Sequence, residues 1–199
     1  QTARPGCYQL GVSITACPGM FGRSKTLTVG PRVLLCNALP HHAIAFKQHG
    51  VVSAGDTLFP GDTAPFHWHN PTFARLLSVG LLRKSVDRAD DTADALANCD
   101  WSCAFPINDV DDFTIVIKPP DPETRRQKLF LHVDIQVDGS ESRAVFSLQE
   151  AALAPYRIDN LTRHSVLVAQ SPCQELEHPR VVEEVPPGGK APFAWEQIT

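Results

Sequence analysis

Residues 60–68 read Pro-Gly-Asp-Thr-Ala-Pro-Phe-His-Trp, and residues 187–195 read Pro-Gly-Gly-Lys-Ala-Pro-Phe-Ala-Trp. Six of the nine positions are identical, in a chain of 199 residues that has 3 tryptophans. A Pro-Gly pair favours a tight turn, and the Pro-Phe-x-Trp stretch after it is typical of a strand. This self-similarity indicates a duplicated structural unit.

A second match precedes the first at nearly the same spacing. Residues 33–37, Val-Leu-Leu-Cys-Asn, resemble residues 156–160, Tyr-Arg-Ile-Asp-Asn, and an apolar stretch follows each of them. Asn160 follows Asn37 by 123 residues and Trp195 follows Trp68 by 127 residues, so the two copies differ by a short loop. We therefore predict an all-β fold made of two tandem, related β-sandwich-like repeats with a polar linker.

Composition suggests where the repeats begin and end. We predict a first repeat, incomplete at its N-terminus, over residues 1–84 and a second repeat over residues 99–199. Residues 85–98 between them are acidic and alanine-rich, and a solvated linker is favoured over one short helix. The 17 prolines and 12 glycines fit many short strands joined by turns. Strands are predicted at residues 8–15, 25–29, 33–37, 43–48, 73–83, 113–118, 129–137, 143–149, 156–160 and 165–170, besides the two Pro-Phe-x-Trp stretches.

Charge and motif content argue against several classes of function. The formal net charge is −4 and the isoelectric point is near 6.0, without a basic stripe, so we expect no nucleic-acid partner. No apolar run is long enough to cross a bilayer, so we expect no direct membrane insertion. The sequence holds neither a nucleophile elbow nor a glycine-rich phosphate loop. We therefore expect no catalytic residues and no cofactor.

Histidines and cysteines leave one alternative open. His67 and His69 would share one face of a strand, a spacing used in some zinc sites. The second copy has Ala194 in place of His67, so surface histidines without a metal are preferred. The six cysteines show no Cys-x-x-Cys pair, which favours reduced thiols, although a secreted, disulfide-bonded sandwich with a histidine metal site is the alternative. They are Cys7, Cys17, Cys36, Cys99, Cys103 and Cys173.

Asn37 and Asn160 each close a strand just before a connection. An asparagine amide both donates and accepts hydrogen bonds, so it can hold the backbone groups at a strand end. A buried structural clasp is favoured over direct ligand contact. The aromatic residues predicted to form the repeat cores are Phe66, Trp68, Trp101, Phe193 and Trp195.

Taken together, the two asparagine-ending strands, the two Pro-Phe-x-Trp strands and Trp-Ser-Cys-Ala-Phe at residues 101–105 resemble the adaptor-binding region of the vacuolar protein sorting-associated protein 13 family. Members of this family are very large, bridge-like lipid transfer proteins of membrane contact sites. The resemblance implies a larger array of β-rich repeats, each with a signature asparagine, that binds Pro-x-Pro motifs of adaptor proteins. It also implies a cytoplasmic, peripheral localisation at organelle membrane contact sites.

An extended, proline-containing peptide can pair with the edge of an exposed strand. We expect the second repeat to supply this edge. In plant members the related region is described as binding a transcriptional regulator, which is the alternative partner. The expected peptide-binding residues are Tyr156, Ile158, Asn160, Val166 and Val168.

Overall fold

A computed structural model describes residues 8–19, 22–52, 55–82, 94–119, 128–170 and 182–196. Nearly all of its regular structure is strand, which confirms the predicted all-β fold. A 3₁₀ turn, η2, spans Ala151–Leu153. The strands are β1 (Leu10–Ala16), β2 (Lys25–Pro31), β3 (Val33–Asn37), β4 (Ala43–Gln48), β5 (Asp56–Leu58), β6 (Thr63–Phe66), β7 (Leu77–Leu82), β8 (Asp111–Ile117), β9 (Leu129–Asp138), β10 (Glu141–Gln149), β11 (Tyr156–Asp159), β12 (Val166–Ala169), β13 (Val182–Val185) and β14 (Lys190–Phe193).

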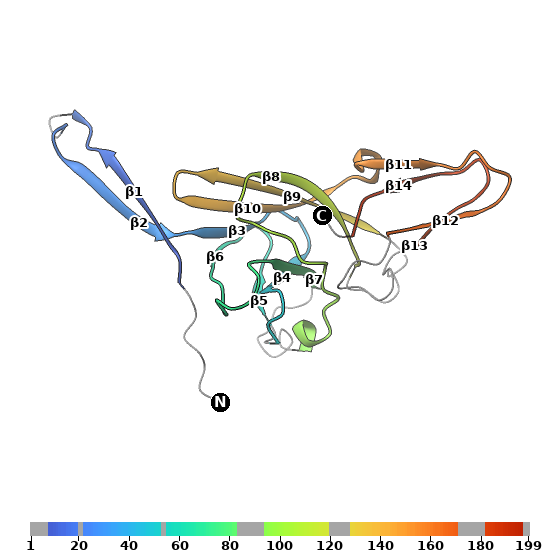
Figure 1. Cartoon of the computed structure of the whole chain (residues 1–199), viewed down its shortest axis with the longest axis horizontal. Coiled ribbons are helices and arrows are strands. Elements are labelled where there is room, and N and C mark those ends of the chain that lie inside the picture. The colour runs from blue at the N-terminus through green and yellow to red at the C-terminus, as the bar shows by residue number, and fades with distance from the viewer. Residues whose placement is uncertain are drawn as a thin grey trace.

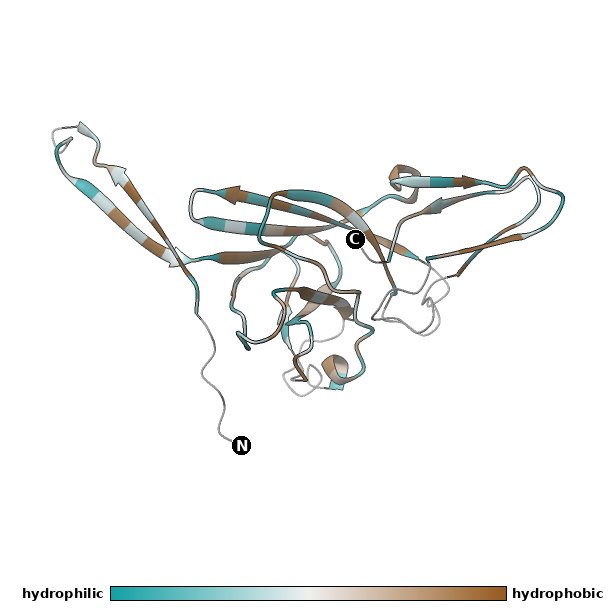
Figure 2. Cartoon of the chain, viewed as in Figure 1, coloured by the Kyte–Doolittle hydropathy of each residue, from teal (hydrophilic) through white to brown (hydrophobic). Residues whose placement is uncertain are grey.

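Two sheets form a central sandwich. One has the strand order β6-β3-β10-β9-β8 and the other has the order β5-β4-β7, and they lie one above the other in Figure 1. Apolar and polar residues alternate along β9 from Leu131 to Asp138, visible as colour bands in Figure 2, and Leu131, Val133 and Ile135 are buried in the core. The shared core includes Leu35 from β3, Ile44 from β4, Val79 from β7, Val133 from β9 and Phe146 from β10.

The five-stranded sheet combines strands from both predicted repeats. Strands β3 and β10 pair in parallel, with Val33 opposite Ser142, whereas the other strand pairs of the described residues are antiparallel. A single hydrophobic core therefore draws on residues from before and after the predicted linker. The boundaries at residues 84 and 99 stay predictions.

Only the end of the predicted linker, residues 94–98, lies within the described part of the chain. Residues 94–97 form a helical turn. Leu96 from this turn is buried against Ala43, Ala45 and Leu82, on the outer side of the three-stranded sheet. The apolar side of this turn thus packs on the fold, while the acidic residue Asp94 is exposed.

Smaller β structures extend from both ends of the sandwich (Figure 1). The β1–β2 hairpin projects from one end. At the other end, the β11–β14 pair and the β12–β13 pair form an arm of two thin layers, which we call the C-terminal half-sandwich. It joins the centre where the Val116 N–H donates a hydrogen bond to the Trp195 carbonyl, 3.3 Å away, and where Ala194 packs on Phe130.

Candidate functional site

The strand that ends at Asn37 is tied to its neighbours through the side-chain amide. Asn37 Nδ2 donates to the carbonyls of His42 and Leu58, both at 2.9 Å, and Asn37 Oδ1 accepts from the Leu39 N–H. The backbone of Asn37 also forms hydrogen bonds with Gly61 and Asp62, in the turn before β6. The side chain is 1% exposed, so this group links the two sheets from within the core.

Asn160 has the same set of partners in the C-terminal half-sandwich. Its Nδ2 donates to the carbonyls of His164 and Val185, both at 2.8 Å, and its Oδ1 accepts from the Thr162 N–H. Its backbone forms hydrogen bonds with Gly188 and Gly189, in the turn before β14. Each asparagine therefore joins a strand, the turn after it and the far end of a second hairpin.

The strands around the two asparagines also share a register. Strand β3 pairs with β6 so that Leu34 lies opposite Pro65, and β11 pairs with β14 so that Arg157 lies opposite Pro192. The aromatic rings that follow are arranged alike as well. Phe66 and Trp68 meet edge to face with centroids 4.8 Å apart, and Phe193 and Trp195 do so at 4.9 Å.

The surroundings of Asn37 and Asn160 differ in the number of neighbouring strands. Strand β3 lies between β6 and β10, and β4 lies between β5 and β7. Among the described residues, β11 pairs only with β14, and β12 pairs only with β13. We call the edge of β11 opposite β14, which carries no described strand, the open edge of β11.

Side chains of the half-sandwich are more exposed than their counterparts, because fewer strands cover them. Val33 is 3% exposed and its counterpart Tyr156 is 49% exposed; Trp68 is 2% exposed and Trp195 is 41% exposed. The expectation that Trp195 lies in a repeat core is therefore corrected. Phe66, Trp68 and Phe193 are buried, and Trp101 is half-buried, with Lys47 Nζ 4.2 Å from its ring centroid.

The residues expected to bind a peptide all lie in the half-sandwich, but they differ in accessibility. Ile158, Val166 and Val168 are half-buried. Tyr156 stands next to Trp195, with ring centroids 5.7 Å apart, and forms an exposed aromatic pair. Asn160 is 4% exposed and its amide is fully engaged, so it supports the strand end and is not open to a ligand.

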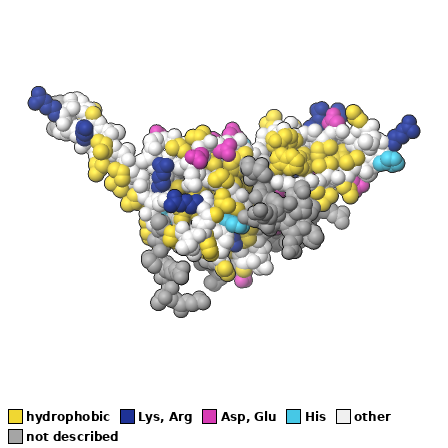
Figure 3. Space-filling view, viewed as in Figure 1, with side chains coloured by type: hydrophobic (Ala, Val, Ile, Leu, Met, Phe, Trp, Pro, Cys, Tyr) yellow, Lys and Arg dark blue, Asp and Glu magenta, His cyan; other side chains and the backbone are white. Residues whose placement is uncertain are grey.

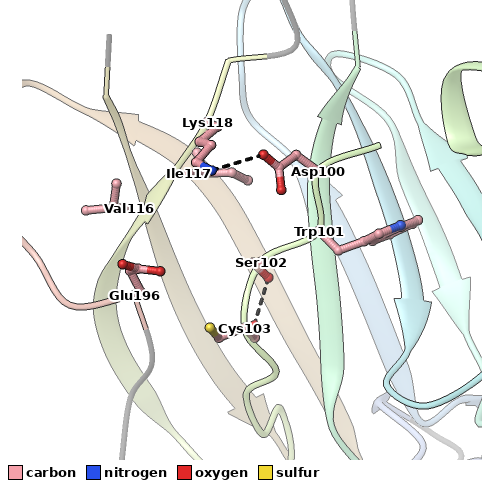
Figure 4. A pocket seen from close by; sticks show the side chains of 8 residues that line it. All are labelled: Asp100, Trp101, Ser102, Cys103, Val116, Ile117, Lys118 and Glu196. Carbon is pink, nitrogen blue, oxygen red and sulfur yellow. Dashed lines mark hydrogen bonds and ion pairs between the residues drawn. The ribbon is translucent and has the colours of Figure 1, made fainter. Parts of the chain in front are cut away.

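A small pocket lies at the joint between the sandwich and the half-sandwich (Figure 4). Its lining includes the Lys118–Asp100 ion pair, 3.5 Å apart, and Glu196. With about 20 Å³ of room, it holds roughly one water molecule. Such a volume does not fit a cofactor or a small-molecule substrate.

His67 and four of the six cysteines, on which the alternative of a metal-bearing, disulfide-bonded sandwich depends, lie within the described part of the chain. They contain no group of three or more side chains placed to hold a metal ion, and the His67 ring packs against Tyr8 at 4.7 Å. The described cysteines form no disulfide; they are Cys17, Cys36, Cys99 and Cys103. Cys7 and Cys173 lie outside the described residues.

A family model for the vacuolar-sorting associated protein 13 (VPS13) adaptor binding domain matches residues 1–197. The chain belongs to this family. It is therefore an adaptor-binding interaction module of a VPS13 protein. Among its described residues, no helix is long and apolar enough to cross a membrane.

Curated relatives share the same family name. The chain is 28% identical to human intermembrane lipid transfer protein VPS13D over 208 residues, which covers 100% of this chain and 4% of that protein. In Dictyostelium discoideum it is 22% identical to intermembrane lipid transfer protein vps13D, covering 96% of this chain and 4% of the relative. It is 21% identical to vps13A of the same organism, covering 96% of this chain and 6% of the relative. This VPS13 adaptor-binding domain thus spans a small part of the relatives it matches.

The contrast between the paired edge of β3 and the open edge of β11 leaves no signal in the local sequence. Two stretches with the same pattern, at 33–37 and 156–160, gave no signal that one would be covered by a third strand. The partner of β3 lies 109 positions further along the chain, and its pattern does not specify which edge it joins.

Proposed function

We propose that this domain binds an extended Pro-x-Pro segment of an adaptor protein at the open edge of β11. The proposal rests on a difference in strand pairing. Strand β3, the counterpart of β11, pairs with β10 along this edge, whereas the same edge of β11 has no partner among the described strands. A strand edge with unpaired N–H and C=O groups favours the addition of another extended chain.

The backbone of β11 is oriented for such an addition. The Asn160 N–H donates to the Gly189 carbonyl, so Asn160 and, by alternation, Ile158 face β14. Arg157 and Asp159 then direct their N–H and C=O groups to the open edge. Their counterparts in β3 face β10, consistent with the bond from the Ala38 N–H to the Phe146 carbonyl at 2.8 Å.

The alternation of a strand also explains why prolines at every second position suit this edge. In β10, which runs parallel to β3, the inward residues Ala144 and Phe146 direct their backbone groups toward β3. An added strand can also run antiparallel to β11 with the same face inward. In that orientation the N–H and C=O groups of its inward residues point away from β11. A Pro-x-Pro segment antiparallel to β11 therefore places both prolines inward. At these positions the pairing with β11 uses no backbone N–H, which proline lacks.

Apolar contacts for the prolines are present on the inner face. Ile158, Val166 and Val168 are only half-buried, and the exposed pair of Tyr156 and Trp195 offers aromatic surface. Aromatic surfaces are common in sites that recognise proline-rich segments. The x residue pairs its backbone with β11 and contributes less to side-chain selection.

The open edge is tested by titrating a labelled Pro-x-Pro peptide and measuring fluorescence anisotropy. Arg157→Pro removes one edge N–H, whereas Arg157→Ala removes the same side chain and keeps the N–H. We expect at least tenfold weaker binding for Arg157→Pro and a change below about threefold for Arg157→Ala, since one lost hydrogen bond and a blocked edge cost about 1.4 kcal/mol or more. Equal affinity of the two variants, both folded by circular dichroism, would contradict binding at this edge.

The orientation is tested with the same assay and a modified peptide. Methylation of the backbone nitrogen of x removes the donor that antiparallel pairing uses. We expect at least tenfold weaker binding than for the parent peptide. Unchanged binding would overturn the antiparallel arrangement.

Binding of this kind would recruit a much longer protein. The relatives are named as intermembrane lipid transfer proteins, and this domain covers 4–6% of them. We propose that the adaptor peptide brings such a lipid transfer protein to organelle membrane contact sites, as a cytoplasmic, peripheral component and as part of a larger repeat array. The domain itself contributes binding and no catalysis.

A further inference from the structure

A polar hollow with a volume of about 460 Å³ lies at the base of the β1–β2 hairpin, where the hairpin meets the central sandwich. In Figure 3, Lys and Arg side chains gather on the sandwich beside this base. Volumes of roughly 300–1,000 Å³ are typical of ligand pockets. Four segments that lie far apart in the sequence line the hollow, which we call the arginine pocket: Gln9 with Leu10, Arg32, Arg75 and Asn108.

The walls of the arginine pocket are fixed to the interior of the five-stranded sheet. The Arg32 N–H donates to the Gln9 carbonyl at 3.1 Å, and the Arg32 carbonyl accepts from the Ser142 N–H of β10 at 2.8 Å. The hydroxyl of Ser142, a buried residue, donates to the Ile107 carbonyl at 2.9 Å, one residue before Asn108. One serine of β10 therefore sets the spacing between Arg32 and the segment that carries Asn108, and it does so in the middle of the fold.

A side-chain contact orients the guanidinium of Arg75. With the amide oxygen of Gln9 turned toward it, Nη1 and Nη2 of Arg75 donate to this oxygen at 3.1 and 3.2 Å. A guanidinium has five N–H donors in a rigid fork, so this contact leaves further donors for another acceptor. The orientation of Arg75 is therefore set before a ligand arrives, which lowers the entropy cost of binding.

Neither arginine of the pocket has an acidic partner among the described residues. By contrast, Arg143 pairs with Glu141 at 3.0 Å and Arg157 pairs with Asp159 at 2.7 Å. The chain has 22 acidic and 18 basic side chains, so a general shortage of carboxylates is not the reason. Two cations that line one pocket without a carboxylate repel each other, and a bound anion removes this repulsion.

We propose that the arginine pocket binds a phosphate monoester, carried by a phosphorylated serine or threonine of a protein partner. The guanidinium fork matches the oxygens of a phosphate, and arginine clusters are a common means of recognising phosphorylated segments. The side-chain amide of Asn108 adds a neutral donor. A protein source is favoured over a membrane because Asp109, Asp111 and Asp112, all exposed, follow Asn108 and repel an extended anionic surface.

The arginine pocket and the open edge of β11 lie at opposite ends of the central sandwich (Figure 1). Phosphate binding therefore does not compete with a peptide at β11. A phosphorylated partner occupies the pocket whether or not an adaptor peptide is bound, so this inference does not depend on the proposed function.

Titration with O-phospho-L-serine tests the pocket, with the NMR shifts of the Arg32 and Asn108 backbone amides as the readout. We expect saturable shifts with O-phospho-L-serine and none with L-serine. Arg75→Gln removes one guanidinium and should weaken binding at least fivefold. Arg143→Gln is the matched control, because Arg143 already has a carboxylate partner, and it should change binding less than about twofold. Absence of saturable shifts in the wild type, or equal effects of the two substitutions, would overturn the site.

Cosedimentation with vesicles of phosphatidylcholine and phosphatidylinositol 4-phosphate tests the source of the phosphate. We expect no cosedimentation that depends on Arg75. Cosedimentation that Arg75→Gln abolishes would assign the phosphate to a lipid headgroup and overturn the protein source. The labelled Pro-x-Pro peptide should bind Arg75→Gln as it binds the wild type, so the pocket and the β11 site can fail separately.

Discussion

One amide group joins three segments at both Asn37 and Asn160. At each position Nδ2 donates to two carbonyls, one just after the strand and one at the end of another hairpin, while Oδ1 accepts an N–H two residues on. A hydroxyl or carboxylate at these positions does not supply two donors and an acceptor in this geometry. The chemistry of asparagine thus explains why the same residue type stands at both strand ends.

Replacing either asparagine should lower stability by leaving these buried backbone groups without partners. For Asn37→Ala and Asn160→Ala we expect the free energy of unfolding to fall by about 1–3 kcal/mol, measured by urea denaturation. Asn70→Ala is the matched control, since Asn70 Oδ1 also accepts from the N–H two residues on, at Thr72, but in an exposed turn. A smaller loss at Asn37 than at Asn70 would argue against the clasp.

Cys99 provides a pH-dependent test. Burial, with a smaller contribution from Asp100, raises the pKa of Cys99 from 9.0 to about 12. Between these values the unfolded chain releases a proton that the folded chain keeps, so stability falls as pH rises through this window. The free energy of unfolding at pH 10.5 relative to pH 8 should fall by up to about 2 kcal/mol more in the wild type than in Cys99→Ala. Parallel pH profiles for the two proteins would contradict the raised pKa.

At the scale of the elements, apolar alternation was a good guide to the long strands. The predicted strands at 33–37 and 43–48 coincide with β3 and β4, and the stretch 129–137 lies within β9. The short strands β5 and β13 were not predicted, because Asp-Thr-Leu and Val-Glu-Glu-Val lack an apolar pattern of sufficient length. They form by antiparallel pairing with the more apolar strands β4 and β12.

The two copies of Pro-Phe-x-Trp allow a matched comparison. Trp68→Ala opens a cavity in the sandwich and should cost about 3–5 kcal/mol of stability. Trp195→Ala removes a side chain that is 41% exposed, and we expect a cost below about 2 kcal/mol together with weaker peptide binding. Thermal or urea unfolding and anisotropy titrations give both quantities. Equal stability losses would show that Trp195 is as well packed as Trp68.

The whole molecule has a thick centre and two thin ends (Figure 1). Only the centre has two facing sheets of three or more strands each among the described residues, and its core side chains are nearly all below 5% exposed. The hairpin and the half-sandwich rely on two-stranded sheets. Local unfolding therefore costs least at the ends.

Hydrogen exchange measures this gradient. Amides of β9 and β10 should exchange at the rate set by global unfolding, and those of β1, β2 and β11–β14 should exchange at least tenfold faster. A saturating Pro-x-Pro peptide should slow exchange in β11. Uniform protection along the chain would contradict the gradient, and unchanged exchange in β11 would argue against the proposed site.

The sequence alone indicated the region of the candidate site but not its form. The repeated motifs predicted a peptide-binding region within residues 156–170. The structure places its predicted residues in the C-terminal half-sandwich: Tyr156, Ile158, Val166 and Val168. The role of Asn160 as a support and the exposure of Trp195 depend on which strands cover which edges. That information lies in pairings between distant segments, which local patterns do not encode.

The parallel pairing of β3 with β10 also has a consequence for synthesis on the ribosome. Val33 pairs opposite Ser142, so β3 and β6 are synthesised well before the strand that joins them to the rest of their sheet. At a translation rate of about 5–20 residues per second, this delay lasts roughly 5–20 s, during which a hydrophobic surface stays open in the nascent chain. Co-translational chaperones, rather than rapid local folding, would then protect the newborn domain from aggregation.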